Sequence, residues 1–409
     1  MTPPELAALR SPAAVRARSH RVLDHVRAGR SPHFTLDEAA LGTVADYVVA
    51  VCRQDYPTLD IPYHSRWRHF SAGGIDRFAV LAEGPLAGQD ARARARTMVD
   101  LAVVSVLLDA GAGDAWRYHE PHGLSIGRSE GLAVASLAMF AAGGFSSDPA
   151  EPLRVDAAGL IGIDAATLAR FFQVSADNPL VGLEGRVALL NRLGHALGAR
   201  PDLFGDGVAQ PGGLVDALAA HAPLGKLPAA GILAALLDGL APIWPAGLVA
   251  EGVELGDVGR HPAILTGDLS EGLVPFHKLS QWLTYSLLEP FEAAGFAVTG
   301  LDDLTGLPEY RNGGLFIDLG LLVPRAPLDP GRKHPVTSEI VVEWRALTVA
   351  LLDVLADAVR ERLGLSAKAF PLAKLLQGGT WTAGRRIAAE RRPPAGPPPL
   401  AILADGTVF

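Results

Sequence analysis

The sequence predicts a mainly α, multi-helical globular protein with a few short β-strands. Of its 409 residues, 49% are hydrophobic and only 20% are charged, which is typical of a chain with a large buried core. Ala and Leu dominate, aromatic residues are scarce, and runs of β-branched residues are short. Apolar residues recur with the period of a helix in several long segments.

The clearest helix is expected over residues 92–109. Val99, Val103 and Val106 follow one another along a single helical face, and two polar residues alone interrupt the apolar run from 98 to 108. Gly111 and Gly113 then end the helix. Comparable patterns predict further helices over residues 36–54, 129–142, 182–198, 229–240, 275–289 and 338–363.

Strand signals are few. The best candidates are residues 315–324 and 400–405, and the βαβ alternation of a dinucleotide-binding fold is absent. We expect one large helical domain over residues 1–390, in one piece or in two lobes that meet near 143–155 or 199–213. Residues 391–409 are expected to form a proline-rich spacer and a terminal strand that packs back onto the body.

The composition and net charge indicate which kinds of partner and which cellular compartment to expect for the protein. A net charge of −8 argues against a binder of nucleic-acid polymers, which would present a basic surface. The single Cys52 excludes an internal disulfide and fits a reduced, cytoplasmic location. The N-terminus lacks the apolar stretch of a secretory signal, and no segment is clean enough to span a membrane.

The segment YHSRWRHF (63–70) concentrates His64, Arg66, Trp67 and Arg68 within five residues. Guanidinium groups bind anions at two points, and an indole ring offers a flat face to a base or sugar. These residues are therefore candidates for substrate binding. The alternative is a surface arm whose arginines pair with nearby carboxylates.

A second polar segment runs from residue 114 to 137. His119, Glu120 and His122 have the side chains of a metal site, but Pro121 prevents the helical spacing that such sites use, so we expect no metal. Arg128 and Glu130 open the next helix. Arg128 is a candidate for substrate binding and Glu130 is an alternative catalytic carboxylate, or a residue that only complements the helix end.

The segment SEGLVPFHKLSQWLTYSL (270–287) places Glu271 just ahead of a helix that Pro275 would begin. A carboxylate in this position is either a solvated charge at the positive helix end or a catalytic group. Lys278, Gln281 and Trp282 lie off the apolar stripe of this helix and are candidates for substrate binding.

Two later segments add candidates. In SEIVVEWRALTVALL (338–352), Glu343 and Arg345 lie in a helix with almost no polar face, so they need partners in a site or in a buried ion pair. In GTWTAGR (379–385), Trp381 and Arg385 share a helical face. They can form a wall of a site or close the structure.

Taken together, these motifs resemble one family. HSRWRHF, GRSEGLAVASLAMF, NPLVGLEGR, SEGLVPFHKLSQWLTYSL, TSEIVVEWRALTV, GTWTAGR and the terminal DGTVF are similar to the family of the fourth protein of the fungal URC uracil-catabolism pathway, which also occurs in bacteria. The resemblance covers nearly the whole chain. It implies a role in uracil breakdown, in a pathway that passes through ribosylurea.

A more distant resemblance concerns chemistry. The queuosine 5′-phosphate N-glycosylases, which are helical and related to DNA glycosylases, carry a catalytic aspartate in the stretch D-Y-R-V-P-Q and a later E-x-R segment. The stretch E-G-L-V-P aligns Glu271 with that aspartate, and EWR aligns Glu343 and Arg345 with the second segment. The resemblance implies a DNA-glycosylase-like, two-lobed helical fold. Glu replaces Asp, and Phe276 stands where that family has Gln.

The resulting hypothesis is an N-glycosidase that cleaves the C1′–N bond of a ribosylurea-type nucleoside or nucleotide without a cofactor. Glu271 would be the catalytic carboxylate. The twelve residues expected to bind substrate are His64, Arg66, Trp67, Arg68, Arg128, Lys278, Gln281, Trp282, Glu343, Arg345, Trp381 and Arg385. Two alternatives remain open, which are an amidohydrolase acting on the ureido group and a non-catalytic partner of the ring-opening enzyme.

Overall fold

The Ala- and Leu-rich segments fold into helices joined by short strand pairs, which confirms the mainly α fold class. The computed structural model describes residues 2–244, 247–329, 331–394 and 396–403. In these ranges the strands pair only two by two, as β1–β10, β2–β3, β4–β9, β5–β6 and β7–β8. No helix in the same ranges is long and apolar enough to cross a membrane.

The described residues form two compact units, each assembled from separate stretches of chain. Unit 1 contains residues 2–64, 247–281 and 300–403, and unit 2 contains residues 65–244 and 282–299. The single large domain and the boundaries predicted from the sequence stay predictions.

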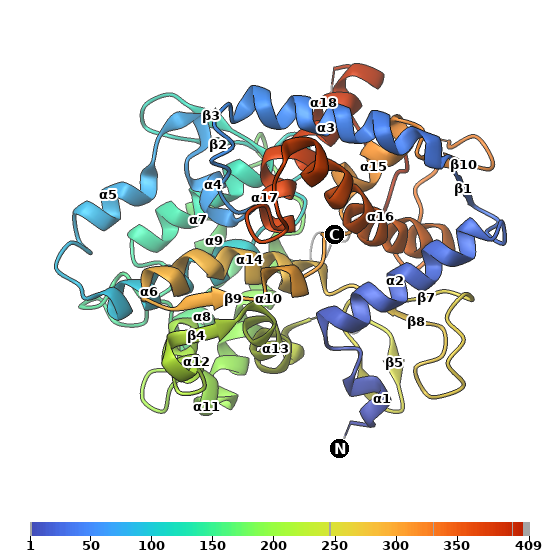
Figure 1. The fold of residues 1–409 in the computed structure, drawn as a ribbon. Helices are drawn as coiled ribbons and strands as arrows, with labels where there is room; N and C mark the ends of the chain where they lie inside the picture. Colours follow the sequence, from blue (N-terminus) through green and yellow to red (C-terminus); the bar gives the residue numbers. More distant parts are fainter. Residues whose placement is uncertain (1, 245–246, 330, 395, 404–409) are drawn as a thin grey trace. The chain divides into compact units, whose positions relative to one another are not determined.

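Unit 1 is built on a long, buried helix, α16 (Glu339–Leu363), against which α2 and α3 pack (Figure 1). As predicted, α16 ends at Gly364, whose φ of 68° lies in the left-handed region that suits glycine. The other helices of unit 1 are α1 (Pro4–Ala7), α2 (Pro12–Arg27), α3 (Leu41–Asp55), α15 (Tyr310–Asp318), α17 (Leu372–Leu375) and α18 (Trp381–Arg391). A π-helical turn (Leu376–Thr380) joins the last two.

The strands of unit 1 form three antiparallel pairs. They are β1 (Phe34–Leu36) with β10 (Leu322–Pro324), β5 (Val249–Ala250) with β6 (Val253–Glu254), and β7 (Val258–Arg260) with β8 (Leu273–Pro275). The β7–β8 hairpin lies directly on α16, since a Cβ atom added at Gly259 would come within 2.6 Å of Val342. This contact fixes the hairpin against the helix that carries the EWR segment.

Unit 2 is organised around α6 (Ala91–Leu107), which is buried along most of its length as its sequence predicts. Its other helices are α4 (Arg66–Phe70), α5 (Arg77–Glu83), α7 (Arg128–Ala141), α8 (Ala157–Ile161), α9 (Ala165–Phe171), α10 (Leu183–Ala199), α11 (Pro201–Phe204), α12 (Leu214–Ala219) and α13 (Ala229–Gly239). Its strands are β2 (Tyr118–His119) with β3 (Ser125–Ile126), and β4 (Lys226–Pro228) in parallel with β9 (Ala297–Thr299).

Helix α14 (Lys278–Ala293) contributes its first four residues to unit 1 and the rest to unit 2. The prediction that Pro275 begins this helix is wrong. Pro275 lies in β8, paired with Val258, and the helix starts three residues later. Lys278, Gln281 and Trp282 were expected off the buried stripe, but Gln281 and Trp282 are also buried.

The strand predicted over residues 315–324 is helix in its first four residues, and only its last three residues form a strand. The stretch through Asp318 belongs to α15, and strand β10 begins only at Leu322. The closest packing of α15 is on α18, where a Cβ atom added at Gly384 would meet the carbonyl oxygen of Arg311. The glycine of the GTWTAGR motif therefore permits contact between two helix backbones.

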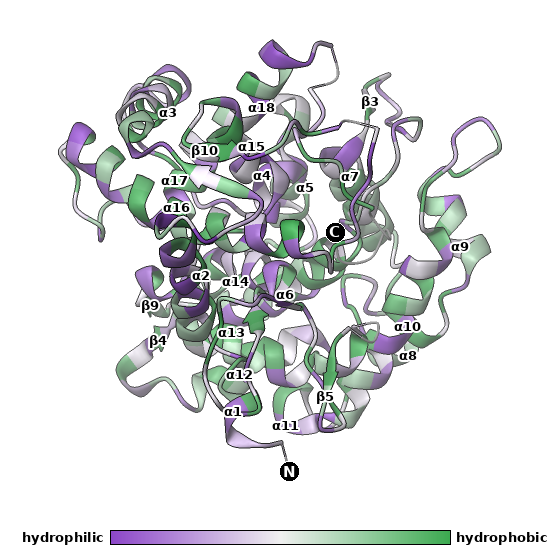
Figure 2. Cartoon of the chain, turned by 90° about the vertical axis from the view of Figure 1, so that its right-hand side faces the viewer, coloured by the Kyte–Doolittle hydropathy of each residue, from purple (hydrophilic) through white to green (hydrophobic). Residues whose placement is uncertain are grey.

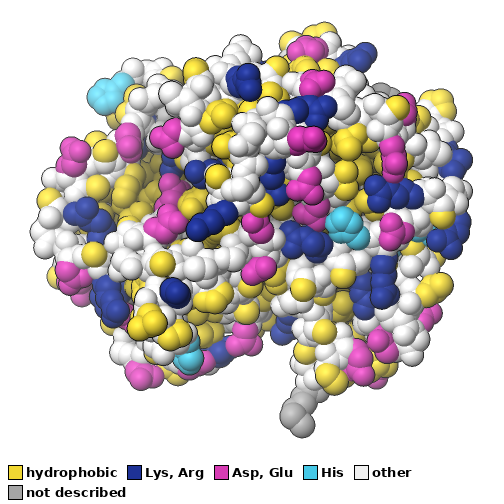
Figure 3. Space-filling view, in the orientation of Figure 1, with side chains coloured by type: hydrophobic (Ala, Val, Ile, Leu, Met, Phe, Trp, Pro, Cys, Tyr) yellow, Lys and Arg dark blue, Asp and Glu magenta, His cyan; other side chains and the backbone are white. Residues whose placement is uncertain are grey.

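At the C-terminal end, Ile402 forms an isolated parallel bridge with His334 in unit 1. Residues 404–409, which include the last two residues of the strand predicted over 400–405, lie outside the described residues. Helices such as α3 carry hydrophobic residues on one side and hydrophilic residues on the other (Figure 2). Basic and acidic side chains intermingle on the face drawn in Figure 3.

Candidate active site

The β7–β8 hairpin leads the chain into α14 and brings Asp257 to the beginning of that helix. Asp257 immediately precedes β7, and the backbone N–H of Phe276, just after β8, donates to its carbonyl oxygen at 2.9 Å. Helix α14 starts two residues further on, at Lys278. The hairpin register therefore decides which carboxylate meets the helix start.

Asp257 caps α14 and pairs with Arg345 of α16. One carboxylate oxygen accepts from the Lys278 N–H at 3.0 Å, and both oxygens accept from the Arg345 guanidinium at 2.8 Å. Burial alone would raise the pKa of Asp257, but the Arg345 guanidinium and the Lys278 N–H lower it to about 2. Asp257 is therefore ionised at neutral pH, and its side chain remains 15% exposed.

Two predicted substrate-binding residues, Lys278 and Arg345, meet at this carboxylate. The Arg345 guanidinium lies over the ring of Phe276, 4.0 Å from its centroid. Glu309 caps α15 through the N–H groups of Arg311 and Asn312, and burial raises its pKa despite these bonds and the nearby Lys278. The beginning of α14 thus gathers two cations and two carboxylates.

Gln281, a third predicted substrate-binding residue, is fully buried one turn into α14. Its side-chain oxygen accepts from the N–H and the hydroxyl of Thr305, at 3.1 and 2.9 Å. Its side-chain nitrogen donates to the carbonyl oxygen of Phe276 at 3.1 Å. These bonds fix the backbone that enters the helix, so Gln281 contributes to the site through Phe276.

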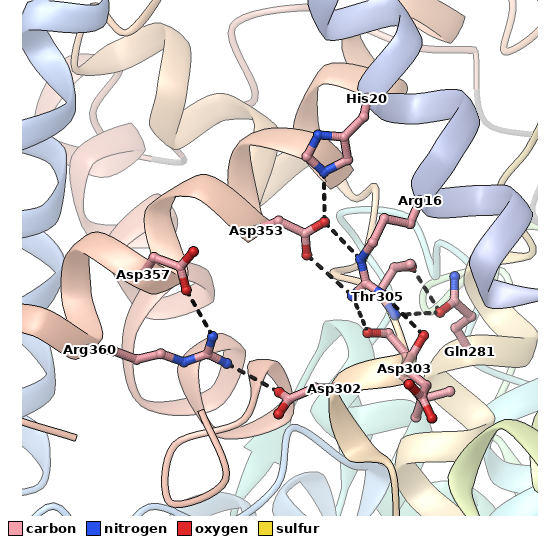
Figure 4. Close-up of polar contacts among 10 residues, drawn as sticks. Arg16, His20, Gln281, Asp302, Asp303, Thr305, Asp353, Asp357 and Arg360 are labelled. Carbon is pink, nitrogen blue, oxygen red and sulfur yellow. Dashed lines mark hydrogen bonds and ion pairs between the residues drawn. The ribbon is translucent and has the colours of Figure 1, made fainter. Parts of the chain in front are cut away.

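The segment that holds Gln281 is itself held by Arg16 of α2 (Figure 4). The Arg16 guanidinium donates to the carbonyl oxygen of Leu304 at 2.8 Å and to Asp353 of α16 at 3.0 Å. His20 bonds to the same Asp353 oxygen at 2.9 Å. A cavity of about 350 Å³ opens beside this group, lined by Arg16, His20, Asp302, Asp353, Ala356, Asp357, Arg360, Ala367 and Leu372.

Glu343 lies two residues before Arg345 on α16 and is completely buried. Its carboxylate accepts a very short hydrogen bond from the Ser31 hydroxyl and bonds to His261 at 2.9 Å. Ser31 follows α2, and His261 follows β7. Glu343 therefore links α16 to the residues that follow α2 and β7. Arg345, two residues later on α16, pairs with Asp257.

Glu271, the predicted catalytic carboxylate, lies at the opposite end of the hairpin. Its side chain is exposed and accepts from the Gly267 N–H at 2.9 Å. Strand β8 lies between Glu271, in the loop of the hairpin, and Phe276, which leads into α14. The carboxylate at the helix start is Asp257, and catalysis by Glu271 stays a prediction.

His64, Trp381 and Arg385 come together in unit 1. The His64 ring bonds to the Gln377 side chain at 3.0 Å and lies 5.7 Å from the Trp381 ring. The Arg385 guanidinium lies 4.8 Å from the centroid of Trp381. Burial lowers the pKa of His64 to about 4, so this histidine is neutral at physiological pH.

In unit 2, Arg66 joins the HSRWRHF and GRSEGL motifs. The fully buried guanidinium donates to the Ser105 hydroxyl at 2.7 Å and to the Ser129 carbonyl oxygen at 3.0 Å, and pairs with Asp109 at 3.3 Å. It also lies 5.7 Å from the centroid of the Trp282 ring. Three of the residues predicted for the site, Arg66, Trp282 and Glu130, therefore lie near one another in unit 2. The charge of Glu130 acts on the Arg66 guanidinium.

The other predicted residues of unit 2 have structural contacts or lie at the surface. The Trp67 indole N–H donates to the Ser286 carbonyl oxygen, and Arg68 pairs with Glu289 at 2.5 Å, so both attach α4 to α14. Arg128 is exposed at the start of α7, and Glu130 is half-buried in the first turn.

Comparison with known proteins identifies the family. The family model described as "Protein of unknown function (DUF1688)" matches residues 8–409. The chain belongs to the DUF1688 family. It is 39% identical over 415 residues to "Protein urg3" of Schizosaccharomyces pombe, with full coverage of both chains. It is 38% identical over 433 residues to "Uracil catabolism protein 4" of Lachancea kluyveri, with 98% of each chain covered. The resemblance to the uracil-catabolism family is thereby confirmed.

In this DUF1688 chain, Glu120 of the metal site considered from the sequence is paired with an arginine. Both oxygens of Glu120 accept from the Arg77 guanidinium, which lowers the pKa of Glu120. In the part of the chain that the structure describes, no group of three or more His, Cys, Asp or Glu side chains is arranged to hold a metal ion.

Sequence reasoning missed Asp257 and His261. Both lie in GDVGRHP (256–262), which has no helical period and no known motif. The one local signal was an aspartate immediately before a single β-branched residue, Val258. Asp257 becomes a candidate only when residues 258–260 are paired with residues 273–275. A local sequence pattern does not specify such a pairing.

Proposed function

We propose that the chain is an enzyme of uracil catabolism, an N-glycosidase that hydrolyses the C1′–N bond of a ribosylurea-type nucleoside or nucleotide. The family membership supports the pathway, because a relative covered over 98% of both chains is named "Uracil catabolism protein 4". The products would be urea and ribose, or ribose phosphate. The reaction uses water and needs no cofactor.

The observation that carries this proposal is the ionised Asp257 at the beginning of α14. Loss of the C1′–N bond leaves positive charge on C1′ and the ring oxygen, and a fixed carboxylate stabilises that charge. The electron pair of the broken bond passes to nitrogen, which takes up a proton as urea leaves. Asp257 orients the water that then adds to C1′ as hydroxyl; the proton that this water gives up balances the one that nitrogen takes up, and the low pKa keeps the carboxylate charged throughout.

Arg345 and Lys278 give the proposed site its selectivity. Arg345 holds both Asp257 oxygens, so the carboxylate cannot turn away from the sugar. Lys278 contacts Asp257 through its backbone N–H, while its ammonium charge acts on the Glu309 carboxylate, and a phosphate on the substrate would have a counter-charge in that ammonium group. The proposal therefore includes a small nucleoside or nucleotide substrate and no nucleic-acid polymer.

The deciding experiment measures urea released from ribosylurea and from its 5′-phosphate. Asp257→Asn is compared with Glu271→Gln, and with Asp318→Asn as a matched control, because Asp318 is also buried and pairs with an arginine through both oxygens. We expect Asp257→Asn to lower the rate about 100-fold or more while the protein stays folded. Glu271→Gln and Asp318→Asn should retain activity.

Each other outcome has a definite meaning. Loss of activity in Glu271→Gln alone would return catalysis to the carboxylate predicted from the sequence. Ammonia without urea would indicate an amidohydrolase. No product from either compound, with or without added metal ions, would end the N-glycosidase proposal and favour a non-catalytic partner.

A further inference from the structure

Several buried polar side-chain atoms of unit 2 have no hydrogen-bond partner among the described residues, and two of these atoms belong to residues in contact with each other. They are Nη2 of Arg66 and Oδ1 of Asp109. The Arg66 side chain is fully buried and the Asp109 side chain is 8% exposed. A buried donor and a buried acceptor without partners are costly, so each of them calls for an occupant.

The remaining atoms of both side chains are already occupied. Arg66 Nε donates to Ser105, and Nη1 contacts the Ser129 carbonyl oxygen, His69 and Asp109. Asp109 Oδ2 is the oxygen that pairs with Nη1, at 3.3 Å. The pair is therefore joined at one point only, and it leaves one donor and one acceptor next to each other.

The chemistry of these two atoms selects a class of ligand. A carbonyl oxygen can accept from Arg66 Nη2, while an adjacent N–H donates to Asp109 Oδ1. A phosphate or carboxylate would satisfy Arg66 but would be repelled by Asp109, and an ammonium group would meet the reverse conflict. A neutral group with C=O beside N–H satisfies both atoms.

The neighbouring rings favour a flat ligand. The guanidinium of Arg66 lies near the face of Trp282, and the His69 ring lies 5.7 Å from the same indole. Flat side chains pack well against planar amide and pyrimidine groups. The Ser129 carbonyl oxygen that contacts Arg66 is in the first turn of α7, next to the exposed Arg128, and the Asp109 side chain itself is 8% exposed.

We propose that Arg66 and Asp109 form a recognition site for a planar, uncharged urea or cyclic imide group. Asp109 accepts a hydrogen bond from the N–H of the ligand, and Arg66 donates one to its C=O. The site belongs to unit 2, whereas Asp257 belongs to unit 1, and it is not part of the hypothesis for bond cleavage. Its link to substrate recognition rests on the proposed function, whereas the binding itself does not.

Calorimetric titration of the full chain with methylurea and uracil tests the proposal, with tetramethylurea and 1,3-dimethyluracil as ligands that lack the N–H. We expect saturable binding of at least one N–H compound and about ten-fold or weaker binding of its methylated counterpart. Binding of methylurea alone or of uracil alone would tell an open urea from a cyclic imide.

Two protein variants provide a second test of the proposed binding site. Asp109→Asn keeps the shape and one acceptor oxygen, which the contact with Arg66 Nη1 takes, so an N–H donor replaces the acceptor Oδ1. Asp100→Asn is the matched control, because Asp100 is buried in the same unit with both oxygens bonded to backbone N–H groups. The proposal requires weaker binding in Asp109→Asn only. Equal binding of methylated and unmethylated ligands, or no saturable binding at all, would overturn it and leave a bridging water as the occupant. Ligand binding without urea release would count against the proposed function alone.

Discussion

Asp257 and Arg345 form a two-point ion pair, in which each terminal nitrogen of the guanidinium lies 2.8 Å from a different carboxylate oxygen. The two residues lie 88 positions apart in the sequence, one ahead of a hairpin and the other within α16. Because the same carboxylate caps α14, the pair joins three elements at the point proposed for catalysis. Its geometry and its ionisation can be tested separately from turnover.

Replacement of Arg345 by Met should destabilise the protein by about 3 kcal/mol or more, because it leaves Asp257 buried without its counter-charge. Asp257→Asn combined with Arg345→Met should cost less than the sum of the single changes. Chemical denaturation of the four proteins in a double-mutant cycle measures the coupling. Additive effects would show that the pair contributes nothing beyond its two separate members.

The pH dependence of stability should reveal the low pKa of Asp257. The folded-state pKa of about 2 lies below the ordinary value of 3.8, so the folded state binds fewer protons than the unfolded state between these values. Stability from this group is complete above pH 4 and is lost as the pH falls toward 2, by about 2 kcal/mol. The difference between the unfolding free energies of wild type and Asp257→Asn should narrow over this window. A constant difference would contradict the ionisation proposed for catalysis.

His64 predicts a second pH window. Burial lowers its pKa from 6.5 to about 4, so protonation opposes folding. The contribution of neutral His64 to the free energy of unfolding is fully present above pH 6.5 and is lost as the pH decreases through 4. His64→Gln should flatten the curve of unfolding free energy between these values. The comparison is made at constant ionic strength, and an unchanged slope in the variant would show that His64 titrates normally.

Glu343 should matter for stability more than its burial suggests. Glu343→Ala removes the partner of both Ser31 and His261 and should cost about 3 to 5 kcal/mol. Glu343→Gln keeps the volume and one acceptor, so it should cost less. Thermal and chemical denaturation measure both changes. Equal and small losses would mean that the hairpin is held to α16 by apolar packing alone.

Arg16 should control the order of the chain entering α14. Arg16→Met removes the donor that holds Leu304, so the amides of Thr305 and Lys278 should exchange their hydrogens faster (Figure 4). Arg362→Met is the matched control, because Arg362 has the same 30% exposure and also joins a carboxylate to backbone carbonyl groups. Unchanged exchange at these amides in Arg16→Met would show that the segment is held elsewhere.

The sequence predicted the helices well because their signals are local. Residues 129–142 became α7 and residues 182–198 became α10, each within a residue of the expected bounds. The prediction over residues 315–324 was wrong because a short apolar run has no reliable period, and Glu309 supplied a helix cap that favoured α15. Local pattern therefore decides long elements, and short ones depend on their neighbours.

The candidate site was only partly predictable. Arg345, Lys278 and Gln281 were recognised as polar residues in apolar surroundings, and the structure brings them to one helix start. The choice of carboxylate depended on the register of the hairpin, which moved Pro275 into a strand and brought Asp257 to the helix instead of Glu271. Pairing over long sequence distances lies outside the reach of a local pattern.

The assembly of unit 1 from distant stretches constrains how the chain emerges from the ribosome. Thr35 of β1 meets Val323 of β10, a separation of 288 residues, and α2 packs on α16. At usual rates of synthesis, roughly 15 to 60 seconds pass between the appearance of these two strands. During that time the apolar face of α2, with Val15, Val22, Leu23 and Val26, has no α16 to cover it. The first helices of the nascent chain are therefore a binding surface for chaperones until α16 has been made.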